Sequence, residues 1–355
     1  MAQMSPPQAG SKKMGFRIRR WAALFAVILI AAVATQTGAV AQGERYRDEV
    51  FASVAVTSDI AYGQAPDTNG QPVTLRLDLY QPDGDREPAR PAFVWIHGGG
   101  FSSGDKADAL EALIGERFAK RGYVVASINY RMREGEYYGF GVGDPRLPEV
   151  IADAQHDAQA AVRWLRANAA AYRIDAARIA VGGFSAGAVA ALYVSYNSSD
   201  PGESGNAGYS SSTSACVDVS GGMDVALMEA GEPPVLVVHG TADSRVPYQG
   251  ALDIVARAQE VGVTVEFHPI EGAAHVVWFD DAEGIIGWMS DFLYRHLAPR
   301  PSVDDDASES SNAAAADDGD SNVWPIVLAG VAAVAVVLAA GALFVRRRLY
   351  SVRRR

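Results

Sequence analysis

The feature that most constrains the fold is a series of short, continuous apolar runs in the middle of the chain. Runs of this length without polar alternation are typical of strands that are buried on both faces, as in a parallel sheet. An earlier segment, residues 73–80, alternates apolar and polar residues and predicts a half-exposed strand. The continuous runs are "AFVWI" (92–96), "YVVASI" (123–128), "RIAVGGF" (178–184), "PVLVVHG" (234–240) and "VTVEFHPI" (263–270).

Segments with helical periodicity separate these runs. Residues 108–122 place Leu110, Leu113, Ile114 and Phe118 at a spacing of three to four residues. Strands that alternate with helices predict an α/β domain with a mostly parallel central sheet and helices on both faces. The other predicted helices lie in residues 150–172, 251–262 and 284–297.

One strand-to-helix junction carries a serine between glycines. Residues 178–196 predict a strand, a tight turn and a helix, with Ser185 in the G-x-S-x-G pattern "GFSAG". In such a turn the serine adopts a strained conformation that lifts its hydroxyl above the sheet, and the glycines let neighbouring backbone approach closely. A Gly/Ser turn without chemistry is the alternative. The position at a strand-to-helix junction favours a nucleophile.

Three glycines follow the first buried run, in the sequence "IHGGGF". A phosphate-binding loop would require a following G-K-[ST] or a G-x-G-x-x-G pattern, and the sequence has neither here. The alternative is an oxyanion hole, in which the backbone N–H groups of Gly98, Gly99 and Ala186 face the oxygen that becomes negative. We expect His97 to hold this loop by hydrogen bonding and Asp105 to cap the following helix.

A serine hydroxyl needs a base to remove its proton, and that base needs an acid to orient it. Among the histidines after Ser185, His275 lies in a loop of small residues after the last predicted strand, where its side chain can reach the serine. Asp243 lies in the loop after a buried strand. We therefore predict a triad of Ser185, Asp243 and His275. The weaker candidates for the base and the acid are His239, His268, Asp253 and Glu271.

The motifs "HGGGF", "GFSAG", "HGTAD…VPY" and "GAAH", in this order, resemble the α/β-hydrolase superfamily. More narrowly, residues 60–298 resemble the HGGG-containing carboxylesterase/lipase group, which includes hormone-sensitive-lipase-like and acetyl-xylan-esterase-like members. The resemblance implies an α/β-hydrolase fold and ester hydrolysis through an acyl-enzyme, without a metal or an organic cofactor. It implies that Ser185 is the nucleophile, that His275 is the general base and then acid, and that Asp243 orients the histidine. The implied oxyanion hole consists of Gly98, Gly99 and Ala186.

Two other functions stay open at this point. One is a serine exopeptidase of the prolyl-oligopeptidase type, which the HGGG loop and the missing propeller domain disfavour. The other is a catalytically inactive surface adhesion or scaffold protein on the same fold. The presence of Ser185, Asp243 and His275 disfavours it, because a binding module does not need all three.

The net charge and the cysteine content further restrict the partners and the kinds of site that we expect. The formal net charge is −11 and the arginine clusters lie at the chain ends, which disfavours nucleic acid as a partner. The single cysteine, Cys216, cannot form an internal disulfide and is expected in the core. The Cys/His spacing does not indicate a zinc site.

The N-terminal 41 residues predict a secretory signal peptide. Basic residues precede an apolar run at 21–34, and Ala39 and Ala41 form an A-x-A site. We expect cleavage after Ala41; an uncleaved anchor is the alternative. The mature hydrolase domain is then residues 42–298.

The C-terminal region predicts a membrane anchor. Residues 299–322 contain seven carboxylates and predict a disordered linker. Residues 323–345 are 23 residues without a charge, enough to span a bilayer. Six arginines follow in residues 346–355, and the positive-inside rule places this tail in the cytoplasm. We therefore expect residues 42–298 on the outer side of a membrane.

The substrate is less constrained by the sequence. The long loop at 132–150 contains Tyr137, Tyr138 and Phe140, which either wall a pocket for an acyl group or a sugar or cover the core. We expect a small-molecule or glycan ester. The sequence does not predict the oligomeric state.

Overall fold

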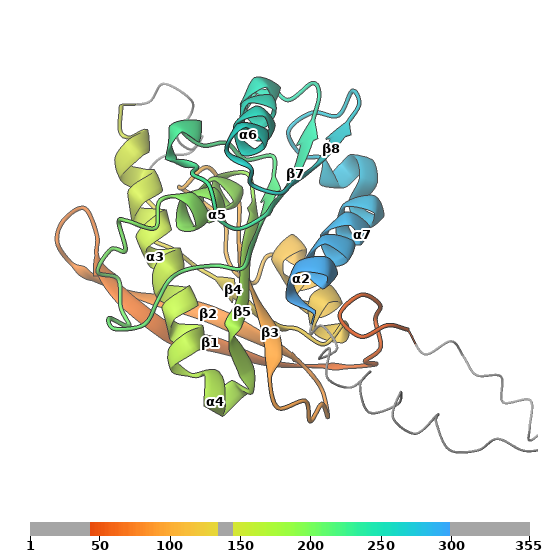
Figure 1. The fold of residues 1–355 in the computed structure, drawn as a ribbon. Coiled ribbons are helices and arrows are strands. Elements are labelled where there is room, and N and C mark those ends of the chain that lie inside the picture. The colour runs from red at the N-terminus through yellow and green to blue at the C-terminus, as the bar shows by residue number, and fades with distance from the viewer. Residues whose placement is uncertain (1–42, 134–144, 299–355) are drawn as a thin grey trace, which may run out of the picture. The chain divides into compact units, whose positions relative to one another are not determined.

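The structure is a computed structural model, and it describes residues 43–133 and 145–298. An eight-stranded sheet forms its centre, in the order β1-β2-β4-β3-β5-β6-β7-β8 (Figure 1). The first two strands pair antiparallel with each other, and β2 pairs antiparallel with β4, whereas all pairs from β4 to β8 are parallel. The strands are β1 (Val54–Pro66), β2 (Pro72–Pro82), β3 (Arg90–Ile96), β4 (Val124–Ile128), β5 (Ile174–Phe184), β6 (Ala215–Val219), β7 (Val235–Gly240) and β8 (Val265–Ile270).

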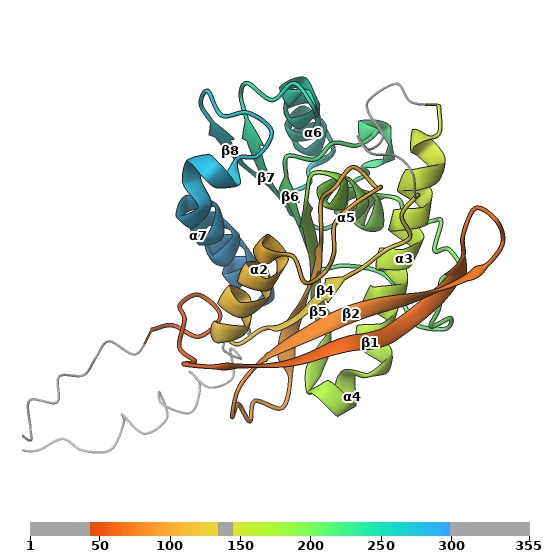
Figure 2. The same cartoon turned by 180° about the vertical axis from the view of Figure 1, so that it is seen from behind.

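Helices cover both faces of this sheet (Figure 1, Figure 2). One apolar cluster joins one face to α3, α5 and α6, and a second joins the other face to α2 and α7. Consecutive residues of β3 show the division, because Val94 belongs to the first cluster and Phe93 and Trp95 to the second. The helices are α2 (Ala109–Lys120), α3 (Leu147–Ala167), α4 (Ala169–Tyr172), α5 (Ala186–Tyr196), α6 (Tyr248–Val261) and α7 (Trp278–Leu297), and a 3₁₀ turn, η1, covers Val225–Leu227.

The predicted mostly parallel sheet with helices on both faces is confirmed. The run at 263–270 differs from the expectation of a strand buried on both faces. It forms β8 at the edge of the sheet, where most of its residues are only half-buried because a single strand, β7, pairs with it. Trp288 of α7 is also half-buried, and it stacks on His268 of this edge strand with ring centroids 4.3 Å apart.

Asp105 does not cap the following helix as expected. Its carboxylate accepts hydrogen bonds from the backbone of Ala107 and from the side chain of Asn129. The residue at the helix start is Asp108, which makes no side-chain capping bond. Asp105 therefore shapes the turn between the glycine loop and α2.

The lone Cys216 lies fully buried in β6, as expected. Burial raises the pKa of its thiol, because a thiolate would lack solvation there. The side chain thus contributes to packing.

Within residues 43–133 and 145–298, no helix is both long and apolar enough to cross a bilayer. The predicted signal peptide, linker, membrane span and basic tail lie outside the described residues.

Candidate active site

Ser185 lies at the sharp turn between β5 and α5. Its φ is 55° and its ψ is −120°, in a region that residues with a side chain rarely occupy. The surrounding structure holds this strained backbone in place. The N–H of Ser185 donates to the carbonyl of Val219 over 2.9 Å, and its carbonyl accepts from Val189 over 3.0 Å. The turn therefore has the strained nucleophile geometry that the G-x-S-x-G pattern predicts.

The two glycines of this pattern are required by close backbone contacts. A Cβ atom on Gly187 would lie 2.0 Å from the carbonyl oxygen of Ile96, and one on Gly183 would lie 2.4 Å from the carbonyl carbon of Gly187. No L-residue with a side chain fits at either position without moving backbone. Their absence of side chains lets α5 begin directly against the end of β3.

The structure brings the three predicted triad residues together. Ser185 Oγ lies 2.8 Å from His275 Nε2, and His275 Nδ1 lies 2.7 Å from Asp243 Oδ2. Because Nδ1–H donates to the carboxylate, Nε2 presents its lone pair to the serine hydroxyl. Ser185 follows β5, His275 follows β8 and Asp243 follows β7, so the three residues meet at the carboxyl ends of parallel strands.

The carboxylate of Asp243 is held on both oxygens. Its Oδ1 accepts from the backbone N–H groups of Arg245 and Val246 over 2.9 and 3.1 Å, while Oδ2 faces His275. The Asp243 side chain is fully buried. These bonds fix the direction from which the acid contacts the imidazole. Within the described residues, the rival candidates Asp253 and Glu271 form no hydrogen bond or ion pair with the triad.

His239 is part of this arrangement, and its role was missed in the sequence. Its Nε2 lies 3.0 Å from the carbonyl oxygen of Val246 and 3.2 Å from Asp243 Oδ2. A carbonyl only accepts, so Nε2 carries the proton and also points it toward the carboxylate. The ring is fully buried at the end of β7. The available signal was the sequence "HGTAD", in which the histidine precedes the acid by four residues.

A buried polar group lies behind His239. Asp218 of β6 accepts a 2.7 Å hydrogen bond from the backbone of Gly221, and burial raises the pKa of its carboxyl to about 6. The nearby His239 opposes this rise in the pKa of Asp218. Asp218 Oδ2, Ser220 Oγ and His239 Nδ1 are buried without a hydrogen-bond partner within the described part of the chain.

The glycine loop after β3 also borders the pocket that contains Ser185. Gly99, Gly100 and Ala186 line the pocket, whereas Gly98 does not, and a Cβ on Gly98 would lie 3.1 Å from the carbonyl oxygen of Phe184. The second and third glycines of the loop therefore line the pocket, and the oxyanion hole of Gly98, Gly99 and Ala186 stays a prediction.

His97 holds this loop, as expected. Its Nδ1–H donates to the carbonyl of Gly98 over 2.7 Å, and burial lowers the pKa of the ring, so it is neutral at pH 7. Tyr130 stacks on the His97 ring and donates its hydroxyl to the His97 carbonyl over 3.2 Å. The loop is therefore fixed before a substrate binds.

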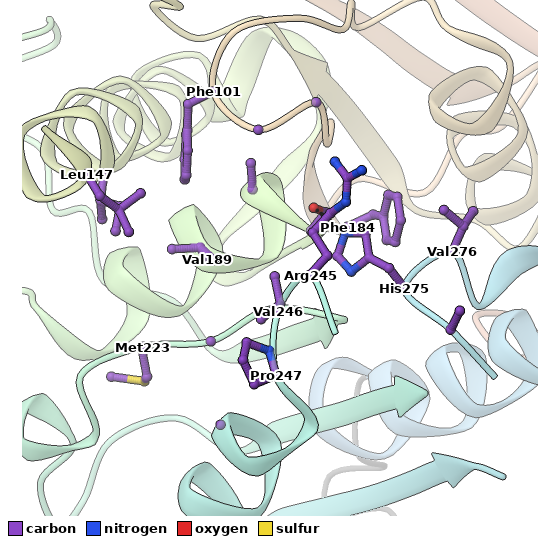
Figure 3. A pocket seen from close by; sticks show the side chains of 18 of the residues that line it. Phe101, Leu147, Phe184, Val189, Met223, Arg245, Val246, Pro247, His275 and Val276 are labelled. Carbon is purple, nitrogen blue, oxygen red and sulfur yellow. Dashed lines mark hydrogen bonds between the residues drawn. The ribbon is translucent and has the colours of Figure 1, made fainter. Parts of the chain in front are cut away.

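A cavity of about 1200 Å³ opens above Ser185 (Figure 3). One side is apolar and is formed by Phe101, Leu147, Val189 and Met223. Arg245 and Val276 lie on the opposite side, next to His275, and Phe279 and Asp280 also line the cavity. The predicted Tyr137, Tyr138 and Phe140 lie outside the described residues.

Comparisons with known proteins agree with this geometry. A family model described as BD-FAE matches residues 77–232, and one described as the prolyl oligopeptidase family matches residues 205–296. A solved structure of esterase 2 from Thermogutta terrifontis with bound propionate superposes with a TM-score of 0.57. The two chains are 25% identical, and the match covers 70% of this chain and 97% of the esterase.

Curated relatives are similar over shorter segments. The bile salt-activated lipase of Rattus norvegicus is 36% identical over 129 residues, which are 34% of this chain and 20% of the lipase. A protein of Oryza sativa subsp. japonica named "Probable isoprenylcysteine alpha-carbonyl methylesterase ICME" is 32% identical over 169 residues, 48% of this chain and 34% of its own length. The chain thus spans about a fifth to a third of these relatives.

The sheet order, the strained serine and the hydrogen-bonded histidine and aspartate define a serine hydrolase of the α/β-hydrolase superfamily. Within that superfamily, the chain is similar to carboxylesterases and lipases.

Proposed function

We propose that this protein is a serine carboxylesterase that hydrolyses ester bonds through an acyl-enzyme. The observation that carries the proposal is the continuous hydrogen-bonded series from Asp243 through His275 to Ser185 at the base of the cavity. The relatives named as a lipase and a methylesterase, and the solved structure named as an esterase, support the same substrate class.

The mechanism follows from the positions of the atoms. Ser185 Oγ attacks the ester carbonyl carbon while His275 Nε2 takes the hydroxyl proton. The carbonyl oxygen becomes negative and receives hydrogen bonds from backbone N–H groups at Gly99, Gly100 and Ala186. The tetrahedral intermediate collapses, the ester C–O bond breaks, and the protonated His275 gives its proton to the leaving alcohol oxygen.

Deacylation repeats these steps with water in place of the alcohol. His275 takes a proton from water as the water attacks the acyl carbon, and then returns a proton to Ser185 Oγ as the acid is released. Asp243 stays ionised and stabilises the imidazolium in both halves. The residues themselves therefore supply every proton transfer in the cycle.

Fluorophosphonate labelling of the full-length chain in detergent tests this proposal. We expect covalent labelling and hydrolysis of para-nitrophenyl acetate, and loss of both in Ser185→Ala. Labelling that persists in the variant would assign the nucleophile to another residue. An unlabelled parent chain that is folded by circular dichroism would favour an inactive scaffold instead.

A peptidase activity is the second candidate, because the prolyl oligopeptidase family model matches residues 205–296, which contain Asp243 and His275. The names of the lipase and methylesterase relatives and of the solved esterase favour the esterase. Para-nitrophenyl esters and dipeptide para-nitroanilides separate the two. Faster turnover of the dipeptide amides at equal concentration would favour the peptidase.

We further propose that the hydrolase domain, residues 42–298, acts at the outer face of a membrane on small-molecule or glycan esters. The support is the sequence: the signal-like residues 1–41, the acidic linker at 299–322, the uncharged run at 323–345 and the arginine-rich tail. Protease added to intact cells should remove the hydrolase domain and leave the tail protected. Protection of both parts would contradict this topology.

A further inference from the structure

Arg245 presents a positive charge to the cavity. It lies in the loop between β7 and α6, is solvent-exposed and lines the pocket above Ser185. Among the described lining residues, Asp280 is the other charged side chain, apart from the titratable His275. A ligand in this pocket therefore meets few charges, and Arg245 is the cationic one.

The backbone of Arg245 is fixed to the triad. Its N–H donates to Asp243 Oδ1 over 2.9 Å, and the carbonyl of the next residue, Val246, accepts from the buried His239 over 3.0 Å. The carboxylate that orients His275 thus also anchors the attachment point of the guanidinium. A substrate group bound by Arg245 would be held in a defined position relative to Ser185.

The guanidinium of Arg245 makes no hydrogen bond or ion pair within residues 43–133 and 145–298. Other arginines at the same edge of the sheet are held by carboxylates: Arg131 lies 2.9 Å from Asp157, and Arg133 lies 3.2 Å from Glu149. A guanidinium with free donors matches the geometry of a carboxylate, phosphate or sulfate, which it can bind through two parallel hydrogen bonds.

The chemistry of the site assigns the two halves of an ester to the two sides of the cavity. His275 must give its proton to the leaving oxygen, so the alcohol half lies on the His275 side. Figure 3 shows Arg245 in this part of the pocket, with Val276 beyond it, while Phe101, Leu147, Val189 and Met223 form the other side. The apolar side is then available to the acyl group.

The alcohol side also carries an apolar surface. Phe279 is 90% exposed at the start of α7, and Val276 is 39% exposed. Large apolar side chains at the rim of a pocket commonly contact ligand, because their exposure to water is unfavourable. An alcohol half with an apolar or aromatic portion would cover them.

We propose that Arg245 forms an anion-binding subsite for the alcohol half, and that the preferred substrates are esters whose leaving alcohol carries an acidic group beside an apolar or aromatic portion. This inference rests on the proposed esterase activity. The reaction leaves the acidic group of the alcohol unchanged. Its contact with Arg245 determines which esters bind in a productive position.

Matched esters test the subsite in the full-length chain. Para-acetoxybenzoate carries a carboxylate in the alcohol half, and its methyl ester is the neutral counterpart with the same ring. A second pair, mono(para-nitrophenyl) succinate and its methyl ester, places the charge in the acyl half. The readout is the ratio of kcat/KM for the anionic ester to that for the neutral one, because a ratio cancels general losses of activity.

In Arg245→Gln we expect the ratio for the first pair to fall about tenfold, the effect of one charge-assisted hydrogen bond. Arg245→Lys keeps the charge and should recover part of the loss. Asp280→Asn removes a repelling charge and should raise the ratio. Arg86→Gln changes an exposed arginine in the loop before β3, at the opposite end of that strand, and should leave the ratio as it is.

The outcomes separate the two proposals. If the unsubstituted chain hydrolyses neither member of either pair, the proposed esterase function fails. If it hydrolyses the neutral esters and Arg245→Gln leaves the ratio for the first pair unchanged, only the anion subsite fails. A ratio that falls for the succinate pair alone would place the bound anion in the acyl half and overturn the assignment.

Discussion

Asp218 predicts a measurable dependence of stability on pH. Its side chain is fully buried in β6, and burial raises the pKa of the carboxyl from its ordinary value of 3.8 to about 6. One unit of pKa difference corresponds to about 1.4 kcal/mol, so the native state disfavours the ionised form by about 3 kcal/mol. Asp218→Asn removes the ionisation and keeps an oxygen to accept from Gly221.

The direction in which the free energy of unfolding changes with pH follows from proton binding. Between pH 4 and 6 the folded chain keeps a proton on Asp218 that the unfolded chain releases, so the free energy of unfolding falls as pH rises. Above pH 6 the carboxylate is ionised in both states, and the full loss of about 3 kcal/mol remains. Asp218→Asn should therefore gain stability relative to the parent across this window and hold that gain up to pH 8.

Urea denaturation of both proteins in detergent, at intervals from pH 4 to pH 8, measures this difference. Subtracting the parent curve from that of the variant cancels the titration of all other groups. A difference that stays flat from pH 4 to 8, or that changes in the opposite direction, would refute the argument that Asp218 is desolvated without an adequate partner.

Three further predictions concern the serine turn, the acid and a second buried carboxyl. Gly187→Ala should destabilise the fold by about 1–3 kcal/mol and reduce fluorophosphonate labelling, because its Cβ would meet a main-chain carbonyl oxygen at 2.0 Å. The control is Gly287→Ala in α7, where a Cβ meets nothing within 4 Å. Thermal melting should show this control to be neutral or stabilising. His239→Leu should lower kcat for para-nitrophenyl acetate about tenfold, because it removes one hydrogen bond to the Asp243 carboxylate. His239→Gln keeps a donor and should recover most of the lost rate. Equal rates in the two variants would contradict a hydrogen-bonding role. Burial raises the pKa of Glu111 from 4.5 to about 7. In the same urea assay, the free energy of unfolding of Glu111→Gln should therefore rise by about 3 kcal/mol relative to the parent between pH 4.5 and 7. A difference that is complete by pH 5 would contradict the raised pKa.

Much of the fold could be predicted from the sequence because its signals are local. A strand buried on both faces must be apolar along its length, and a helix shows its buried face as a three-to-four spacing. The serine turn was recognisable for the same reason, since Gly183 and Gly187 are needed where backbone approaches within 3 Å of any Cβ. These requirements act within a few residues and leave a pattern in the sequence.

Contacts that depend on the exact path of a loop were harder to predict. The triad positions of Asp243 and His275 followed from chain order and loop context, but the contact of His239 with Asp243 did not, because a buried histidine at a strand end looks the same with or without a charged partner. The sequence likewise left open that Gly100 rather than Gly98 lines the cavity, since three consecutive glycines look alike in a sequence.

The sequence by itself determined the alternation of strands and helices, the strained serine and the class of chemistry, because backbone sterics and periodic burial restrict which residues can stand at those positions. The tertiary structure alone decided that β8 is an edge strand, that His239 contacts the acid and that Arg245 faces the cavity beside His275. The edge position of β8 and the placement of Arg245 beside His275 depend on the order in which strands pair, whereas the contact of His239 with Asp243 depends on the turn of the loop after β7.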